Sequence, residues 1–418
     1  MPRLSFNAPS LRTLLAIGLI LGLGLGSLSA TTSKSVRATT QAVPPAPEFA
    51  SDFSSLRLRT GFGPVPYLAN DGRVHLDYEI YLTNRKPNAV KVTRVQVVDA
   101  NTPSKVIVDL IGADLDHFVT SDLDKNIEGP TVKGGGGSIM YIDTSVDTFN
   151  EVPALLMHIV ESEDNETGKA YPTIRGALTA PLDIKVPMLA QPVSNGVWIA
   201  AEGCCFKSHH RRPPITLSGQ DFLAQRYAID FIKLVDGKLW EGDDPKNLEA
   251  WYTYGEDALA VVDGTVSSVL DNEDDITPFE PNPKPRNVDN ITGNHVIIDM
   301  GNGLYVVYAH LQPGSILVKV GDKVKVGDKL ALIGNSGNTD APHLHIHVMD
   351  DNHVVQSHAV PFVFESYELL GSFKSIDTLL PEPFGEVGPE DPNLLDAPKQ
   401  VTNAYPLELR ILRFGEGG

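Results

Sequence analysis

The sequence predicts an all-β protein in which a β-sandwich is followed by a second, antiparallel β domain. Its 418 residues include 31 prolines and 36 glycines, a composition that favours many turns between short elements. Val74–Leu82 alternates apolar and polar residues with the period of two that a half-buried strand requires. Turn signals rich in Gly, Asn and Asp separate this segment from others like it. The chain is long enough for two or three domains.

The first predicted domain spans residues 49–188, where we expect an immunoglobulin-like β-sandwich. Further strands are predicted at Val90–Val98 and Val106–Leu110, and another apolar run covers Ala154–Val160. The segment contains no grouping of residues typical of a catalytic site, so it is predicted to be an accessory domain.

The second predicted domain spans residues 197–364 and has short strands rich in β-branched residues. These strands are expected at Ala258–Val269, Asn294–Met300, Tyr305–Leu311, Leu317–Val320 and Lys329–Ile333. Residues 365–418 form a Pro-rich, acidic tail that is expected to pack on the surface.

Charge and cysteine content narrow the class of protein. The formal net charge of −19 argues against a nucleic-acid partner, because phosphate binding needs a basic face. The two cysteines, Cys204 and Cys205, are adjacent, which excludes a conventional disulfide framework. A strained disulfide ring, two free thiols and a pair of ligands for a soft metal all remain open for them.

The N-terminus has the features of an export signal, predicted at residues 1–30 and followed by a linker at 31–48. Arg3 and Arg12 supply positive charge, and Leu14–Leu25 forms a short apolar core. Ala30 is a small residue suited to cleavage. The apolar core is short for a membrane span, so cleavage is favoured over an uncleaved anchor, and no later stretch is long enough to cross a membrane. We therefore expect an exported protein, located in the periplasm or outside the cell.

The histidines of Pro342–Val348 carry the strongest chemical signal. His343, His345 and His347 occupy alternate positions, so on a strand they share one face. Neutral imidazole is a common zinc ligand, and neighbours on one face can converge on a single ion. For a His-x-His pair alone, a polar strand face with surface histidines is the better interpretation.

The surrounding motifs change that balance. A turn, Gly334-Asn-Ser-Gly-Asn-Thr-Asp-Ala-Pro, leads into His343, and a predicted strand ends at Tyr308-Ala-His310. The segment Tyr254–Val266 precedes this strand, and the repeated Gly-Asp turns of Val320–Lys329 lie between the strand and the turn. This order of motifs resembles the lysostaphin-type, or LytM-like, zinc metalloendopeptidases, which act on the peptides of peptidoglycan.

The resemblance implies a small antiparallel β core with a groove on one face, and it implies roles for particular residues. By this resemblance, His345 and Asp230 of Tyr227-Ala-Ile-Asp-Phe are zinc ligands, and His343 and His310 are catalytic histidines. Three protein ligands leave one position on zinc open for water, which the metal activates. Neutral imidazoles nearby can accept a proton and stabilise the developing oxyanion.

The sequence departs from the family at the usual first ligand, four residues before Asp230. That position is Arg226, whose guanidinium has only donors and cannot bind zinc. Either the site has lost its metal, or another histidine replaces the missing one. The adjacent His209 and His210 are the candidates. A basic surface turn is an equally good interpretation of this segment.

A hairpin offers one route for that replacement. Ile215–Gln220 predicts a hairpin with a Ser-Gly turn, whose preceding arm would run back beside Gln220–Asp230. Ideal pairing selects His209, whereas a bulge at the two prolines before the hairpin selects His210. The segment also resembles a variant subgroup of the family in which the His beside Arg211 is constant. His210 is therefore the predicted first ligand, with His209 as the alternative.

Three functions are consistent with these patterns. The leading hypothesis is a zinc metalloendopeptidase of peptidoglycan, with zinc held by His210, Asp230 and His345. A catalytically inactive protein of the same fold that binds and activates cell-wall hydrolases is the second, and Arg226 is the feature that supports it. A peptidase that acts on other secreted proteins is the third.

Overall fold

A computed structural model describes residues 53–115, 119–120, 130–205, 208–212, 214–284, 287–288, 290–375 and 392–415. The predicted signal at 1–30 and linker at 31–48 lie outside these residues. The described chain is almost entirely strands and turns, with two short 3₁₀ helices at Phe149–Glu151 and Leu248–Ala250 and helical residues at Asp114 and Leu115, as the all-β prediction requires. No helix among the described residues is long and apolar enough to cross a membrane.

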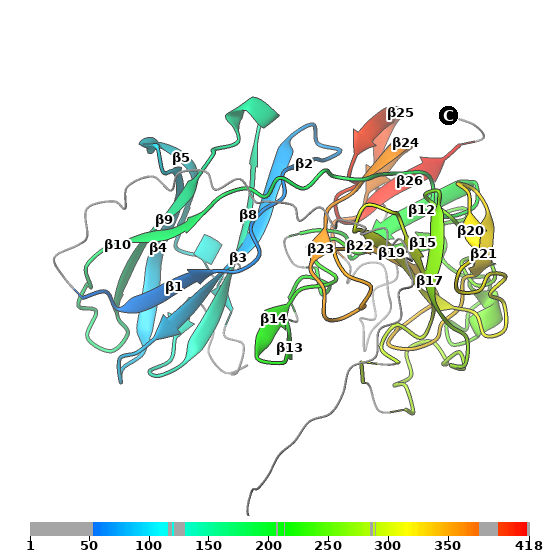
Figure 1. The fold of residues 1–418 in the computed structure, drawn as a ribbon, viewed down its shortest axis with the longest axis horizontal. Coiled ribbons are helices and arrows are strands. Elements are labelled where there is room, and N and C mark those ends of the chain that lie inside the picture. The colour runs from blue at the N-terminus through cyan, green and yellow to red at the C-terminus, as the bar shows by residue number, and fades with distance from the viewer. Residues whose placement is uncertain are drawn as a thin grey trace, which may run out of the picture. The chain divides into compact units, whose positions relative to one another are not determined.

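Two sheets form the N-terminal part of the described chain (Figure 1). The first contains β1 (Leu56–Thr60), β3 (Val74–Asn84), β8 (Gly137–Val146) and β6 (Val119–Thr120) in that order, with β2 (Tyr67–Leu68) beside β3. The second contains β10 (Ile174–Thr179), β9 (Leu156–Asp164), β4 (Val90–Asp99) and β5 (Thr102–Ile111), with β7 (Thr131–Val132) beside β4. This order is compatible with the predicted immunoglobulin-like sandwich, whose sheets follow the order A-B-E-D and G-F-C-C′.

Both faces of β3 are buried. Tyr78 and Ile80 pack with Val95 of the other sheet in one apolar cluster between the two sheets. The alternate residues Asp77 and Glu79 point to the opposite face because side chains on a strand alternate. Their exposed fractions are only 0% and 1%, so this polar face is covered by other parts of the chain.

One large sheet organises the rest of the described chain. Its main path contains β11 (Met188–Leu189), β24 (Val363–Ser372), β26 (Arg410–Phe414), β12 (Gly196–Ala201), β15 (Ile229–Lys233), β22 (Leu344–Met349), β19 (Tyr305–Leu311), β18 (Asn294–Asp299), β17 (Gly264–Leu270) and β20 (Lys323–Val324). β23 (Ala359–Val360) pairs with β22, and β25 (Asn393–Ala404) pairs with β24. Two small sheets join β13 (Ile215–Leu217) to β14 (Gln220–Phe222) and β16 (Asp257–Leu259) to β21 (Lys329–Leu332).

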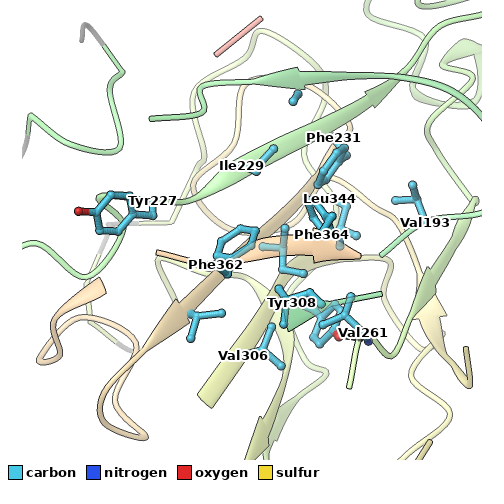
Figure 2. Close-up of a cluster of buried hydrophobic side chains, with 14 of the residues drawn as sticks. Val193, Tyr227, Ile229, Phe231, Val261, Val306, Tyr308, Leu344, Phe362 and Phe364 are labelled. Atoms are coloured by element: carbon cyan, nitrogen blue, oxygen red, sulfur yellow. Dashed lines mark hydrogen bonds between the residues drawn. The ribbon is translucent and has the colours of Figure 1, made fainter. Parts of the chain in front are cut away.

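An apolar cluster covers one face of the central strands (Figure 2). Ile229 and Phe231 of β15 lie in it with Leu344 of β22, Tyr308 of β19 and Phe364 of β24. All five side chains are fully buried. Because strand residues alternate, the residues between them must occupy the opposite face of the sheet. The functional side chains therefore lie on the face turned away from this cluster.

Three predicted elements differ from those observed. Ala258–Val269 is split into β16 and β17, which belong to different sheets, because a turn at Asp263–Gly264 separates them. Leu317–Val320 is not a strand, and two of its apolar side chains are more than half exposed. The tail expected to pack on the surface instead contributes β24, β25 and β26 to the central sheet, and Leu412 of β26 is fully buried.

His158 makes the stability of the sandwich depend on pH. Its Nδ1 donates to the carbonyl oxygen of Ala177 at 2.7 Å, and its Nε2 accepts from the Tyr78 hydroxyl at 2.6 Å. Burial lowers the pKa of His158 from 6.5 to about 4. Between these values the unfolded chain binds a proton that the folded chain excludes. The free energy of unfolding should therefore fall by up to about 3 kcal/mol as pH decreases from 6.5 to 4.

A His158→Gln variant tests this expectation in urea titrations over the same pH range. The variant lacks the titrating group, so the difference in unfolding free energy between it and the wild type should shrink as the pH falls. A difference that stays constant with pH would contradict the assignment.

Candidate metal centre

The pairing of β15 with β22 places a carboxylate beside an imidazole. Asp230 is the register partner of His345, and both point away from the apolar cluster that contains their neighbours Phe231 and Leu344. Nδ1 of His345 lies 2.9 Å from Oδ1 of Asp230. Both residues are buried, with exposed fractions of 1% for His345 and 9% for Asp230. The sheet thus holds the two ligands that the resemblance implied within direct contact.

Two further imidazoles reach the same place and are oriented by backbone carbonyls. Nδ1 of His343 donates to the carbonyl oxygen of Ala341 at 2.7 Å, and Nδ1 of His310 donates to that of Ser336 at 2.7 Å. These bonds leave each Nε2 with a lone pair. Nε2 of His343 lies 3.4 Å from Oδ2 of Asp230.

An irregularity in β19 turns His310 toward the site. The register between β18 and β19 shifts between Asn294 and Val296, and His310 has a φ of +62°. Such bulges re-aim a side chain near functional sites. A non-glycine residue in the left-handed region costs on the order of 1–3 kcal/mol. Hydrogen bonds from His310 N–H to the Thr292 carbonyl and from its ring to Ser336 hold it there.

His210 reaches the site from the loop that follows β12. Ala201, the last residue of β12, pairs with Asp230, so the chain leaves this strand next to the carboxylate. The carbonyl oxygen of Glu202 then accepts a hydrogen bond from Nδ1 of His210 at 2.9 Å. Nε2 of His210 lies 3.3 Å from Oδ2 of Asp230. His209 points elsewhere: its ring contacts the Glu202 carboxylate at 2.8 Å, and its side chain is 81% exposed.

The path of the chain to His210 differs from the hairpin pairing predicted from the sequence. The predicted Ser-Gly hairpin is present, but its pairing extends only from Leu217↔Gln220 to Ile215↔Phe222. Among the described residues, no ladder continues from this hairpin to Asp230. The structure therefore brings His210 to Asp230 through β12 and not through the predicted arm, and His209 stays outside.

A cavity of about 440 Å³ opens over these groups, and its lining includes His210, Asp230, His310, His343 and His345. Burial alone would raise the pKa of Asp230, but His210 and His343 hold it well below its usual range. Burial lowers the pKa of His345 to about 4 and that of His310 well below its usual value. The site therefore combines an ionised carboxylate at Asp230 with neutral imidazoles at His310 and His345, the forms that bind metals.

The ring of His210 carries the positive charge that balances Asp230. Burial opposes protonation of His210, yet the Asp230 carboxylate outweighs it and raises the pKa of His210 to about 9. A proton on this ring balances the buried carboxylate. A dication bound by the same two residues would supply that balance and release the proton.

Two overlapping groups of residues have ligand atoms within 4.8 Å of one another. One contains His210, Asp230 and His345, and the other contains His310, His343 and His345. Only the first includes an anionic ligand, which helps to retain a dication. Its nitrogen and oxygen donors are those that zinc binds, with a position left open in catalytic sites. The donor set thus fits zinc.

A comparison with known families identifies the domain. Residues 250–357 match the model of peptidase family M23. The segment is an M23 peptidase domain. The match contains His310, His343 and His345 but begins after His210 and Asp230. The assignment of these two residues to the M23 site therefore rests on their geometry.

Curated relatives resemble a short part of the chain. The peptidoglycan DD-endopeptidase ShyA of Vibrio cholerae is 47% identical over 53 residues, 13% of this chain and 12% of the relative. An uncharacterized metalloprotease of Buchnera aphidicola is 46% identical over 56 residues, 13% of this chain and 14% of the relative. The matches thus span less than a sixth of either relative.

Solved structures of low sequence identity also match parts of the chain. The catalytic domain of lysostaphin from Staphylococcus simulans is 16% identical, with 41% of this chain and 88% of that chain covered and a TM-score of 0.21. A zinc-containing peptidase from Vibrio cholerae is 15% identical, with 72% and 83% covered and a TM-score of 0.21.

The M23 site includes a histidine whose role the sequence did not predict. Nε2 of His345 lies 2.9 Å from Nδ1 of His347, and both rings are fully buried. Because Nδ1 of the neutral His345 ring donates to the ionised Asp230 carboxylate, Nε2 of His345 accepts from Nδ1 of His347, and this contact orients the His345 ring. The signal was present in the sequence, because His347 shares the strand face of His343 and His345.

Arg226, at the place of the usual M23 ligand, is an internal ion-pair partner. Its guanidinium contacts both oxygens of Glu79 on β3. Arg211 donates to the same carboxylate at 3.1 Å and also to the carbonyls of Tyr78 and Ile142. All three charged side chains are at most 2% exposed. Arg226 thus joins the M23 part of the chain to the sandwich sheet.

The loop that carries His210 is attached at a second point. Cys204 and Cys205 are paired as a disulfide, one of the three alternatives that the sequence left open. The N–H of Cys204 donates to the Tyr405 hydroxyl at 2.8 Å, and the Cys205 carbonyl accepts from Arg211.

Replacing Glu79 by Gln should destabilise the protein strongly. The substitution keeps the shape of the side chain but leaves Arg211 and Arg226 buried without a counter-charge, which costs about 3–5 kcal/mol of unfolding free energy. Glu368→Gln is the matched control, because Glu368 pairs with Arg413 where both side chains are more than a third exposed. Urea titration should show a change below about 1 kcal/mol for the control. Equal losses of unfolding free energy in the two variants would contradict a stabilising role for the buried group of Glu79, Arg211 and Arg226.

Gly337→Ala tests the support of His310. A Cβ at Gly337 would collide with the backbone of Gly293, which would displace the neighbouring Ser336 carbonyl that holds the His310 ring. Gly301 has a similar φ, +79° against +86°, but open space around it. Gly301→Ala should cost about 1–2 kcal/mol of unfolding free energy from backbone strain alone. Gly337→Ala should cost at least about 2 kcal/mol more, and equal losses would argue against a tight contact.

Proposed function

We propose that this protein is a zinc-dependent metalloendopeptidase that cleaves peptide bonds of peptidoglycan outside the cytoplasm. One observation carries the proposal: Asp230, His345 and His210 converge in a buried cavity beside two further imidazoles, those of His310 and His343. Zinc bound there would supply a Lewis acid that activates water and polarises the scissile carbonyl.

The chain itself supplies the orientation of the ligands. Asp230 provides the negative charge, and its register with His345 holds both atoms on one face of the sheet. The Glu202 carbonyl fixes the tautomer of His210 so that Nε2 faces the carboxylate. His347 contacts Nε2 of His345 and so holds that ring with Nδ1 toward the carboxylate. Outer partners of this kind orient metal ligands and raise their basicity.

His343 and His310 are suited to proton transfer. Each donates Nδ1–H to a backbone carbonyl and so presents the lone pair of Nε2. Burial and the neighbouring histidines keep the pKa of His310 low, so its ring is neutral before the reaction. A neutral imidazole can accept a proton from the attacking water, and the resulting imidazolium can donate to the oxyanion or to the leaving amine.

The substrate class rests on the M23 match and on relatives named as peptidoglycan DD-endopeptidases. The predicted signal at residues 1–30 supports an exported location, where such a substrate would be met. The sandwich at 49–188 would serve as an accessory domain that is joined to the catalytic part through Glu79.

The alternative of an inactive binding protein loses its main support. Arg226 was the feature that favoured it, because an arginine in place of a ligand indicates a lost metal. The burial of Arg226 against Glu79 gives that residue a different role, and His210 supplies a third donor beside Asp230. We therefore favour an active enzyme.

His210→Ala and His209→Ala form a matched pair of tests. The first removes a donor that lies 3.3 Å from Asp230, whereas the second removes an exposed ring from the adjacent position. We expect His210→Ala to bind zinc at least about tenfold more weakly and to lose most hydrolysis of purified peptidoglycan. His209→Ala should resemble the wild type in both measurements.

Zinc content by mass spectrometry and release of soluble peptides from peptidoglycan check this expectation. A protein that retains no zinc, and whose His345→Ala variant behaves like the wild type, would support the binding-protein alternative. Hydrolysis of secreted proteins but not of peptidoglycan would reassign the substrate.

A further inference from the structure

The polar face of β3, far from the M23 site in sequence, contains a group of side chains of the types that bind metals. His75, Asp77 and Glu79 lie on this face at alternate positions, and their exposed fractions are 8%, 0% and 1%. Glu79 is neutralised by Arg211 and Arg226. His75 and Asp77 have no such cationic partner within hydrogen-bond distance among the described residues.

A third ligand comes from the neighbouring strand. The pairing of β3 with β8 sets Asp143 directly opposite Asp77. One ligand atom each from His75, Asp77 and Asp143 lies within 4.8 Å of the others. Bonds of about 2 Å to one tetrahedral ion would bring such atoms to roughly 3.4 Å apart, so a small contraction of the group suffices. Asp143 is partly exposed, which gives a cation access from solvent.

The hydrogen bonds of this group leave metal-binding atoms without partners. Oδ2 of Asp77 accepts from the Tyr67 hydroxyl at 2.7 Å, whereas the buried Oδ1 has no partner among the described residues. Nε2 of His75 lies 2.9 Å from a carboxylate oxygen of Asp71, and the buried Nδ1 has no partner there either. A carboxylate that holds one ring nitrogen while the other stays free is the usual arrangement around a metal-binding histidine.

Two carboxylates of this group face each other, because Asp77 is the register partner of Asp143. Arg211 lies nearby, but its donors are bound by Glu79 and by backbone carbonyls. Two carboxylates around one histidine would be balanced by a dication.

We propose that His75, Asp77 and Asp143 form a second divalent-cation site, which binds zinc and joins β3 to β8. Zinc suits one imidazole nitrogen and two carboxylate oxygens in a compact group, with a water molecule as the fourth ligand. The Asp71 carboxylate orients His75, and the Tyr67 hydroxyl orients Asp77. The ion would link the two strands, because its three protein ligands come from β3 and from its register partner β8.

The test uses the full chain with the M23 site disabled by His345→Ala. This variant, dialysed and then titrated with zinc chloride, should bind one zinc per chain and gain thermal stability on binding. Adding His75→Ala should abolish this binding, and adding Asp143→Asn, at a partly exposed position, should weaken it by at least about tenfold. Asp71→Asn should also weaken binding by roughly tenfold, because its carboxylate only orients the ring.

Asp147→Asn is the matched control, since Asp147 is an exposed carboxylate just beyond the end of β8 and should leave zinc binding unchanged. Circular dichroism identifies any variant that fails to fold. If His75→Ala fails to fold, the zinc affinity of the Asp143→Asn variant tests the proposal instead. The proposal is overturned if the His345→Ala protein binds no zinc, or if its zinc survives both His75→Ala and Asp143→Asn. Failure of the proposed M23 zinc site would give a different result. The zinc content of the His345→Ala variant would then equal that of the wild type.

Discussion

The register between β15 and β22 sets the position of the groups in the M23 site. Ile229, Phe231 and Leu344 pack into the apolar cluster, so Asp230 and His345 must face the other way. A slip of one residue would turn the carboxylate and the imidazole into the core and expose the apolar side chains. Such a slip would forfeit the burial of several large side chains, each contributing about 1.5–3 kcal/mol. The energy that fixes the core therefore also fixes the ligands.

Around this pair, backbone carbonyls hold the remaining imidazoles. Glu202, Ser336 and Ala341 each accept a hydrogen bond from Nδ1 of one histidine. The loops that supply these carbonyls are themselves fixed by pairing of β12 with β15 and by the close contact between Gly293 and the Ser336–Gly337 backbone. A carbonyl accepts only one tautomer of its partner, so the ring orientation exists before any metal or substrate binds.

The sequence predicted the groups whose placement depends on local alternation. His343, His345 and His347 share a face because they are two residues apart on one strand, and the Ser-Gly hairpin follows from its own residues. Long-range pairings were beyond such reasoning. His210 depends on the pairing of β12 with β15, and the partner of Arg226 is 147 residues away.

Local bulges and tail strands were also missed for physical reasons. The turn of His310 toward the site depends on a register shift against β18, which no residue type announces. The tail was expected on the surface because it is acidic and rich in Pro. Its strand β26 is nevertheless central, because Ile411 and Leu412 pair with β12 on one side and with β24 on the other.

The place of β26 in the sheet has a consequence for the timing of maturation. β12 precedes the loop that carries His210, and it lies between β15 and β26. The backbone of Glu408, Leu409 and Arg410 also bonds or pairs with Ala200 and Cys204. β12 is thus made well before β26, the strand that pairs with one of its two edges. Because Arg410–Phe414 is made near the end of synthesis, the edge of β12 that it covers stays unpaired in the nascent chain until then.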